Sequence, residues 1–388
     1  MKIVKLNNKI FISDPVTKTN DISLIKVYKK ESKEHGFYLK VLCDVLALRT
    51  KTLDKKAFNK RKNQLYDLRM NIRSHEYKDY ILFEYYANYV ADEFIDHKIE
   101  KQVLDLFEDF CSNTKYDQID VELSIETLSL NYSILKDNYI AYSKRIAKDI
   151  QLRKNEKYPT LDFNIDCINN FDLKKLKNIN LELKKEIFFY HSPTEKQINN
   201  LDIIDGQIKV DNYKCDDEYE EYEKNIGLDQ ANLNLFFQSD KEHNKEAMQI
   251  FSSIFGGGIF SKLFVNVREK NSLCYTINSN YVNQKVISVF CGLQNDMIEK
   301  TMQLINIELD KIKAGDIQEF DIAVEKMISD YKRSANSYQL HKNLIQNNIL
   351  KNHEDDIEKI IKQFKQVKKK DIIKIAKDLK LTKKVIVR

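Results

Sequence analysis

Arg268 and Tyr275 lie seven residues apart, shortly after the run of three glycines Gly256, Gly257 and Gly258. An arginine guanidinium offers planar, permanently charged donors to peptide carbonyl oxygens, and a tyrosine hydroxyl can donate to an oxyanion that develops during acyl transfer. Consecutive glycines allow a positive φ and the close approach of another backbone. These residue types together could bind an extended peptide. The same residues are also compatible with a turn between two helices that binds nothing. In that case Arg268 would cap a helix end and Tyr275 would pack against its neighbours.

The residues around this pair indicate the elements that would position it. Five apolar residues fall on one face of a short helix predicted over Phe260–Lys270: Ile259, Phe260, Leu263, Phe264 and Val267. Arg268 lies at the C-terminal end of that helix. From Leu273 onward, apolar and polar residues alternate, which predicts a strand. The helix end and the strand start should therefore be close neighbours.

A hydrolytic zinc site needs three protein ligands, an open position for water and a nearby carboxylate base. The chain has seven histidines and six cysteines, and neither His-x-x-Glu-His nor His-Glu-x-x-His occurs in it. No pair of histidines has metal-ligand spacing, and no Cys-x-x-Cys is present. The cysteines are expected to be reduced and mostly buried, as in a cytoplasmic protein.

The segment from Gly256 to Tyr275 resembles the C-terminal domain of insulinase and pitrilysin-type metallopeptidases (inverzincins), the family that contains mitochondrial processing peptidase. The resemblance rests on the glycine turn and on Ser261-Lys262-Leu263-Phe264, Arg268-Glu269-Lys270, Leu273 and Tyr275. It implies that Arg268, Tyr275 and the three glycines contact substrate near the scissile bond, from the domain opposite the zinc.

The zinc motif of that family is degenerate in this chain. In the family, His-x-x-Glu-His is soon followed by Gly-Thr, and matching Arg49-Thr50 to that dipeptide places Lys40, Cys43 and Asp44 over the His, Glu and His positions. The third ligand would fall at Leu130-Asn131, neither of which is a carboxylate. The resemblance therefore implies no metal on this chain, with zinc expected on a partner.

Composition narrows the classes of partner. The chain has 64 basic and 59 acidic residues and a net charge of +5, which is typical of solvated helix faces. Among the lysine-rich stretches Lys55–Lys62 and Lys368–Lys370, only Phe58 is aromatic, which is too little for a nucleic-acid stacking platform. No run of about 18 apolar residues predicts a membrane span. Met1–Ser13 alternates polar and apolar residues and is typical of an edge strand, without the apolar core of a signal peptide.

Hydrophobic periodicity predicts strands and helices in a similar order in both halves, and therefore an α+β fold. Among these elements are one long helix over about 121–150, a helix over Lys245–Phe255 and a strand over Val286–Leu293. We expect an N-terminal insulinase-like domain with the degenerate zinc motif over 1–205, an acidic interdomain linker over 206–227 and a C-terminal insulinase-like domain over 228–388. The resemblance implies two similar α/β-sandwich domains, each a mixed sheet covered by helices, that form one half of a clamshell.

The present and absent motifs together predict a non-catalytic, zinc-less subunit of a heterodimeric insulinase-family peptidase. Such a subunit is inactive alone and positions peptide substrate for a zinc-bearing paralogous partner, because alignment of the peptide and activation of water are separable tasks. The alternative is a catalytically silent homologue that holds peptide or serves structure as a homodimer. Neither a nucleic acid nor a membrane is an expected partner.

Overall fold

The computed structural model describes residues 1–196, 198 and 202–388. Residues 197 and 199–201, which fall in the predicted N-terminal domain, lie outside the described residues. The chain divides into two compact units. Unit 1 contains 1–132, 156–213 and 336–354, and unit 2 contains 133–155, 214–335 and 355–388. These ranges differ from the contiguous domains predicted from the sequence, because each unit includes one helical segment from the other half of the chain.

Unit 1 is built on a mixed six-stranded sheet with the order β1-β2-β6-β3-β5-β4. Its strands are β1 (Lys2–Leu6), β2 (Lys9–Ser13), β3 (Thr19–Lys29), β4 (Arg69–Glu76), β5 (Tyr80–Val90) and β6 (Leu183–Ser192). Strand β2 pairs with β6 in parallel, and the other neighbours are antiparallel. The expected edge strand at the N-terminus is present as β1, and β4 forms the opposite edge.

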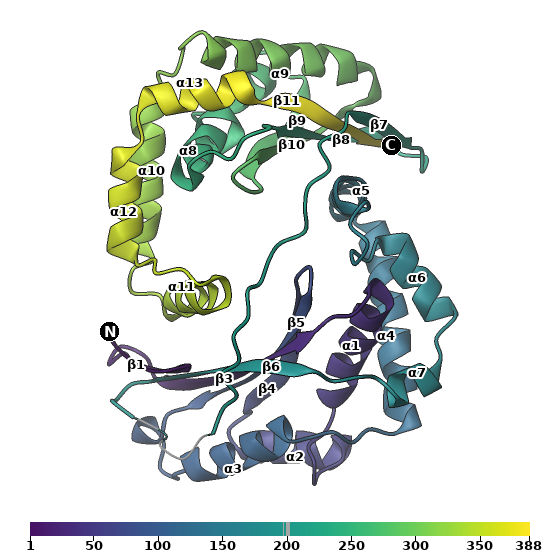
Figure 1. Ribbon diagram of the computed structural model, residues 1–388, viewed down its shortest axis with the longest axis vertical. Coiled ribbons are helices and arrows are strands. Elements are labelled where there is room, and N and C mark those ends of the chain that lie inside the picture. The colour runs from purple at the N-terminus through teal and green to yellow at the C-terminus, as the bar shows by residue number, and fades with distance from the viewer. Residues whose placement is uncertain (197, 199–201) are drawn as a thin grey trace. The chain divides into compact units, whose positions relative to one another are not determined.

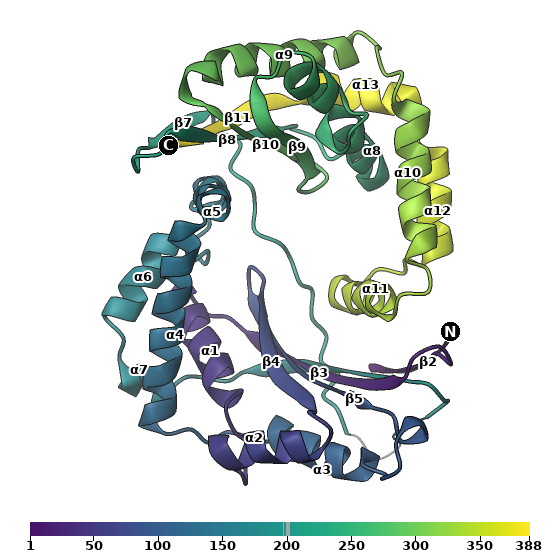
Figure 2. The ribbon, with the colours of Figure 1, turned by 180° about the vertical axis from the view of Figure 1, so that it is seen from behind.

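Successive side chains of a strand point to opposite faces of the sheet, so the core of unit 1 consists of two clusters, one on each face. Phe188 and Tyr190 of β6 belong to the cluster that packs under α1, whereas Ile187 and Phe189 belong to a second cluster on the other face. The helices of this unit are α1 (Lys33–Leu46), α2 (Lys55–Gln64), α3 (Glu100–Cys111), most of α4 (Gln118–Asp137), α6 (Leu161–Asn169), α7 (Leu173–Lys177) and α11 (Tyr338–Lys351), with the short turn η1 (Asp92–Phe94). Figures 1 and 2 show them around the sheet.

Helix α11 comes from the C-terminal half of the chain and covers the second face of the unit 1 sheet. Its Tyr338 ring stacks on His191 with a centroid separation of 4.2 Å. Its Lys342 ammonium pairs with Glu84 of β5. No strong apolar stripe marks this helix in the sequence, so its periodicity did not predict it.

Unit 2 is built on a mixed five-stranded sheet with the order β7-β11-β8-β10-β9. Its strands are β7 (Glu220–Lys224), β8 (Gln230–Gln238), β9 (Cys274–Tyr281), β10 (Val286–Gln294) and β11 (Lys380–Val387). Strand β7 pairs with β11 in parallel, and the remaining pairs are antiparallel. Strand β9, which carries Tyr275, is therefore at the edge of the sheet.

The helices of unit 2 are α5 (Tyr139–Leu152), α8 (Lys245–Gly256), α9 (Ile298–Lys313), α10 (Phe320–Arg333), α12 (Ile357–Gln366) and α13 (Lys369–Asp378), with the turns η2 (Phe264–Glu269) and η3 (Asn295–Met297). Helix α8 packs against β9 and β10, and α5 packs against β8 and β11 (Figure 1). The single long helix predicted over about 121–150 is two helices. They separate at Asn138, whose side chain accepts a hydrogen bond from the Ala141 amide and caps α5.

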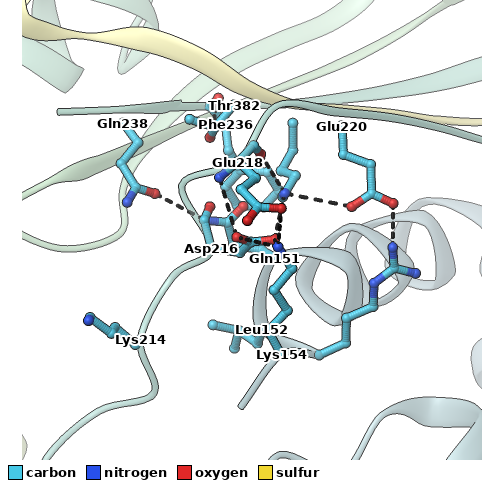
Figure 3. Close-up of polar contacts among 12 residues, drawn as sticks. Gln151, Leu152, Lys154, Lys214, Asp216, Glu218, Glu220, Phe236, Gln238 and Thr382 are labelled. Carbon is cyan, nitrogen blue, oxygen red and sulfur yellow. Dashed lines mark hydrogen bonds and ion pairs between the residues drawn. The ribbon is translucent and has the colours of Figure 1, made fainter. Parts of the chain in front are cut away.

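In the segment 206–227, predicted as an acidic interdomain linker, the acidic residues after Cys215 are held on unit 2 by ion pairs. Lys383 is fully buried, and its Nζ lies 2.8 Å from Asp216 Oδ2 and 2.6 Å from the Glu218 carbonyl oxygen. Lys154 also pairs with Asp216 and Glu218. Figure 3 shows Lys154, Asp216 and Glu218 beside Gln151. Acidic residues that are neighbours in the sequence are therefore neutralised by Lys154 and Lys383, which are far from them along the chain.

The end of the same segment is strand β7, which the sequence did not predict because its residues are mostly charged. It pairs with the final strand β11, and its two faces alternate between half-buried and exposed residues. Arg153 pairs with Glu220 at its start.

In the described part of the chain, no helix combines the length and the apolar character needed to cross a membrane.

Candidate functional site

The positions matched to the zinc motif lie on α1, whose N-terminus is capped by Ser32. The Lys40 ammonium forms an ion pair with Glu76 of the neighbouring strand β4. Cys43 is fully buried, and burial raises the pKa of its thiol well above the usual range. Asp44 is exposed. A cation, a buried neutral thiol and a single free carboxylate do not make a zinc site.

Glu76 is instead the centre of an ion-pair network. Fully buried Lys30 places its Nζ 2.7 Å from Glu76 Oε1, and the Tyr213 hydroxyl donates to the same oxygen at 2.9 Å. Burial would raise the pKa of Glu76, but the charges of Lys40 and Lys30 lower it. The ammonium of Lys40 is thus used to neutralise a structural carboxylate.

The residues matched to the third ligand, Leu130 and Asn131, lie on α4 and are exposed. In the ranges that the structure describes, no group of three or more His, Cys, Asp or Glu side chains could hold a metal ion. Phe58, the one aromatic residue of the lysine-rich stretch of α2, is fully buried and cannot stack on a base.

The glycine run ends α8, as predicted, and brings this helix close to β9. A Cβ on Gly256 would lie 2.7 Å from the Ser279 backbone nitrogen and 2.9 Å from the Ser279 Cβ. Gly257 is the C-terminal cap, with φ −88°. The expected positive φ is not found at any of the three glycines. Gly256 is therefore required for close packing, and the run is not a left-handed turn.

Between the glycines and β9, the chain forms the π-helical turn η2 where an ordinary short helix was predicted. The Lys270 amide donates to the Val265 carbonyl at 3.0 Å, which is a π-type bond. Leu263 and Val267 are buried, as expected, but Ile259 is 77% exposed and lies outside the packed face. Ser272, with φ 52°, then turns the chain into β9.

Arg268 and Tyr275 line one surface depression of about 500 Å³, together with Glu269, Cys274 and Gln294. The Arg268 side chain is 41% exposed, and its guanidinium lies 4.8 Å from the Phe264 ring centroid, which orients it. Tyr275 is 52% exposed on the edge strand. The structure thus brings the two predicted residues to one depression, where Arg268 Nε also lies 3.7 Å from Glu269 Oε1.

Cys274, at the base of this depression, was not selected from the sequence. Its thiol is hydrogen-bonded to that of Cys291 on β10, and this bond, together with the nearby Arg268 charge, lowers the pKa of Cys274. The two cysteines are far apart in the sequence, and only the pairing of β9 with β10 brings them together.

Tyr275 also borders a second depression of about 960 Å³, which it shares with Gly292 of β10, with Tyr139 at the start of α5 and with Asp137. None of these three residues was selected from the sequence. Asp137, with its neighbour Asn138, had served only as the match that placed the third-ligand position at Leu130-Asn131, and no function was predicted for it.

Comparisons with known proteins agree with this fold. Residues 194–329 match the family model described as the peptidase M16 inactive domain. The chain is 31% identical over 159 residues to the probable inactive metalloprotease YmfF of Bacillus subtilis (strain 168). That alignment covers 39% of this chain and only 37% of the relative's own length.

Two solved structures share the fold over the whole chain. A conserved protein from Enterococcus faecalis V583 superposes with a TM-score of 0.80 and 16% identity, over 100% of this chain and 98% of that one. The peptidase M16 inactive domain from Pseudomonas fluorescens superposes with a TM-score of 0.75 and 14% identity, over 100% and 97%. Over residues 194–329 the chain is therefore similar to the peptidase M16 inactive domain, and over its whole length it shares the fold of these solved structures.

Proposed function

We propose that this chain is a cytoplasmic, zinc-less subunit of a two-chain M16 peptidase, which binds peptide and positions it for a zinc-bearing paralogous partner. The observation that carries the proposal is the contrast between two sites. Lys40 and Cys43, at the motif positions, are committed to an ion pair and to the core. Arg268 and Tyr275 remain half-exposed in one depression.

The geometry of the second site suits a peptide. Tyr275 lies on β9, an edge strand of the unit 2 sheet. An edge strand can pair with an extended chain, while neighbouring side chains fix its register. The Arg268 guanidinium would bind a carbonyl oxygen, and the Tyr275 hydroxyl would donate to the oxygen that becomes negative during hydrolysis. The partner's zinc would supply the activated water.

The test is cleavage of a quenched-fluorescent peptide by this chain mixed with a zinc-bearing paralogue. Removal of one oxyanion donor costs about 100-fold in rate or more in well-studied enzymes, so Arg268→Ala and Tyr275→Phe should each lower kcat/KM strongly. Arg333→Ala on α10 and Tyr219→Phe near β7 are matched controls on exposed residues and should have no effect. Unchanged rates for both site variants would refute the assigned roles.

The alternative is a homodimer that holds peptide or serves structure. The molecular mass of the purified chain in solution distinguishes it from this proposal. A subunit that needs a companion should be monomeric by size exclusion with light scattering and should shift to a heterodimer when the paralogue is added. A stable homodimer that ignores the paralogue would favour the alternative.

A further inference from the structure

Two cysteines are neighbours in the sheet of unit 2. Cys274 begins β9, and Cys291 lies on the adjacent strand β10. The two strands pair antiparallel with Leu293 opposite Cys274, and Cys291 lies two residues before Leu293. Because residues two apart on a strand share a face, the two cysteines lie diagonally across the strand pair on one face of the sheet. Their thiols are hydrogen-bonded to each other.

The two thiols differ in their access to solvent. Cys274 is 8% exposed and lines the depression of about 500 Å³ beside Arg268 and Tyr275. Cys291 is fully buried. A small reagent in this depression therefore reaches Cys274 first, and Cys291 lies behind it as the second thiol.

The surroundings of Cys274 favour its reactive form. The hydrogen bond from the Cys291 thiol and the nearby Arg268 charge lower the pKa of Cys274, although burial opposes them. The same hydrogen bond and burial raise the pKa of Cys291. A thiolate is the nucleophile in cysteine oxidation, and a neighbouring thiol can resolve the first oxidation product as a disulfide. The pair thus combines an attacking and a resolving cysteine.

The other four cysteines lack this combination. Burial raises the pKa of Cys43, Cys111, Cys167 and Cys215. Cys43 and Cys111 are in the core of unit 1. Cys167 and Cys215 are less buried than Cys274, so exposure alone would make them the more reactive thiols. The order of reactivity therefore distinguishes a built site from simple exposure.

The backbone beside Cys274 can shift toward β10. Thr276 is opposite Gly292 and Cys274 is opposite Leu293, so Tyr275 is an extra residue in β9. Such a bulge interrupts the ladder of hydrogen bonds. Strand β9 is also at the edge of its sheet. A disulfide requires its sulfur atoms to be about 2.05 Å apart, which is closer than a hydrogen bond, and the bulge at the sheet edge permits this approach.

We infer that Cys274 and Cys291 form a redox pair that a hydroperoxide oxidises to a disulfide. With hydrogen peroxide, the Cys274 thiolate attacks one oxygen, the O–O bond breaks, hydroxide leaves and a sulfenic acid forms. The Cys291 sulfur then attacks the Cys274 sulfur. The S–O bond breaks, the thiol proton leaves with the hydroxyl group as water, and the S–S bond forms. Two electrons pass from the thiols to the peroxide, and peptide binding plays no part in this step.

The test is mass spectrometry of the whole purified chain after treatment with hydrogen peroxide and then with iodoacetamide. Trypsin cleaves after Lys285, so Cys274 and Cys291 fall in different peptides. Without a reductant, we expect one species that joins these two peptides with the loss of two hydrogen atoms. Dithiothreitol should separate them. The other four cysteines should be found alkylated by iodoacetamide.

Substitutions test the role of each partner. Cys291→Ser should stop the reaction at the sulfenic acid, which dimedone traps on Cys274. Cys274→Ser should leave the buried Cys291 reduced. Arg268→Met should slow the oxidation of Cys274 by about threefold or more, because it removes a charge that favours the thiolate. Cys215→Ser is the matched control and should leave the yield of the disulfide unchanged. Circular dichroism checks that each variant is folded.

Two outcomes would overturn the inference. One is oxidation of Cys167 or Cys215 before Cys274, because exposure alone would then decide reactivity. The other is a sulfenic acid on Cys274 of the wild-type chain that never joins Cys291.

The redox pair and the proposed function can fail separately, because the oxidation experiment uses neither peptide nor partner. If no disulfide forms while Arg268→Ala and Tyr275→Phe lower cleavage, the redox pair is refuted and the proposed function stands. If the disulfide forms but these two variants leave cleavage unchanged, the redox pair stands and the proposed peptide site is refuted.

Discussion

At Gly256, helix α8 lies close to β9, and the role of this glycine follows from the lack of space for a side chain. A Cβ at this position would overlap backbone and side-chain atoms of Ser279, which belong to a sheet and cannot move freely. At Gly258, a Cβ would meet the Phe260 ring at 3.1 Å, and a ring can rotate away. Gly256 and Gly258, two glycines of one run, therefore have unequal importance.

Gly256→Ala should lower the free energy of unfolding by about 1–3 kcal/mol, the usual cost of overpacking a core. Gly258→Ala should cost clearly less. Urea unfolding followed by circular dichroism measures both. Equal effects of the two substitutions would contradict the packing argument, because only the first meets backbone atoms.

At the scale of elements, α11 is held on the unit 1 sheet by a buried ion pair. The side chains of Lys342 and Glu84 are only 6% and 12% exposed. Burial would raise the pKa of Glu84, but hydrogen bonds from His75 and Lys342 and their charges bring it down to about 2. Because the pKa of Glu84 is lower in the folded than in the unfolded chain, this carboxylate stabilises the fold at any pH above its unfolded pKa. That stabilisation is lost as the pH falls through about 2.

Lys342→Met should destabilise unit 1 by about 3–5 kcal/mol at neutral pH, because it leaves a buried carboxylate without its cation. The double variant with Glu84→Gln should recover much of this loss. Amide hydrogen exchange of α11, measured between pH 4 and 8, reports the effect on the helix itself. If the single and double variants exchange alike, the ion pair is not what holds α11.

The acidic segment is the second element held by charge. Burial would raise the pKa of Asp216, but the hydrogen bonds from Lys383 and Lys154 lower it. Stability from this group is therefore complete above the unfolded pKa of about 3.9 and is lost as the pH falls through the lower folded value. Asp216→Ala should cost about 3–5 kcal/mol, since it strands the buried Lys383. Asp217→Ala, on the exposed neighbour, should be neutral in thermal unfolding. Equal melting temperatures of the Asp216→Ala and Asp217→Ala variants would refute the role given to Asp216.

At the scale of the whole molecule, the prediction concerns metal. Because Lys40 pairs with Glu76 and Cys43 is in the core, the purified chain should retain no stoichiometric zinc, and EDTA should leave its melting temperature unchanged. Elemental analysis and calorimetry check this directly. Stoichiometric zinc, together with a lower melting temperature in EDTA, would contradict the assignment of the chain as zinc-less.

Most elements could be predicted from the sequence because their signals are local. The helix predicted over Lys245–Phe255 is α8, and the strand predicted over Val286–Leu293 is β10, each within one residue of the structure. Both have a strong apolar period. Strand β7 and helix α11 were missed because their places depend on distant partners, respectively β11 and the unit 1 sheet.

The sequence by itself determined the family resemblance, the non-ligand residues at the zinc motif and the pairing of Arg268 with Tyr275, because these depend on residue type and short spacing. Only the tertiary structure decided which segments make up each unit, that Lys383 holds the acidic segment, and that Asp137 and Tyr275 line one depression. Such contacts join residues that are far apart along the chain. They depend on strand order and helix packing, which local periodicity does not encode.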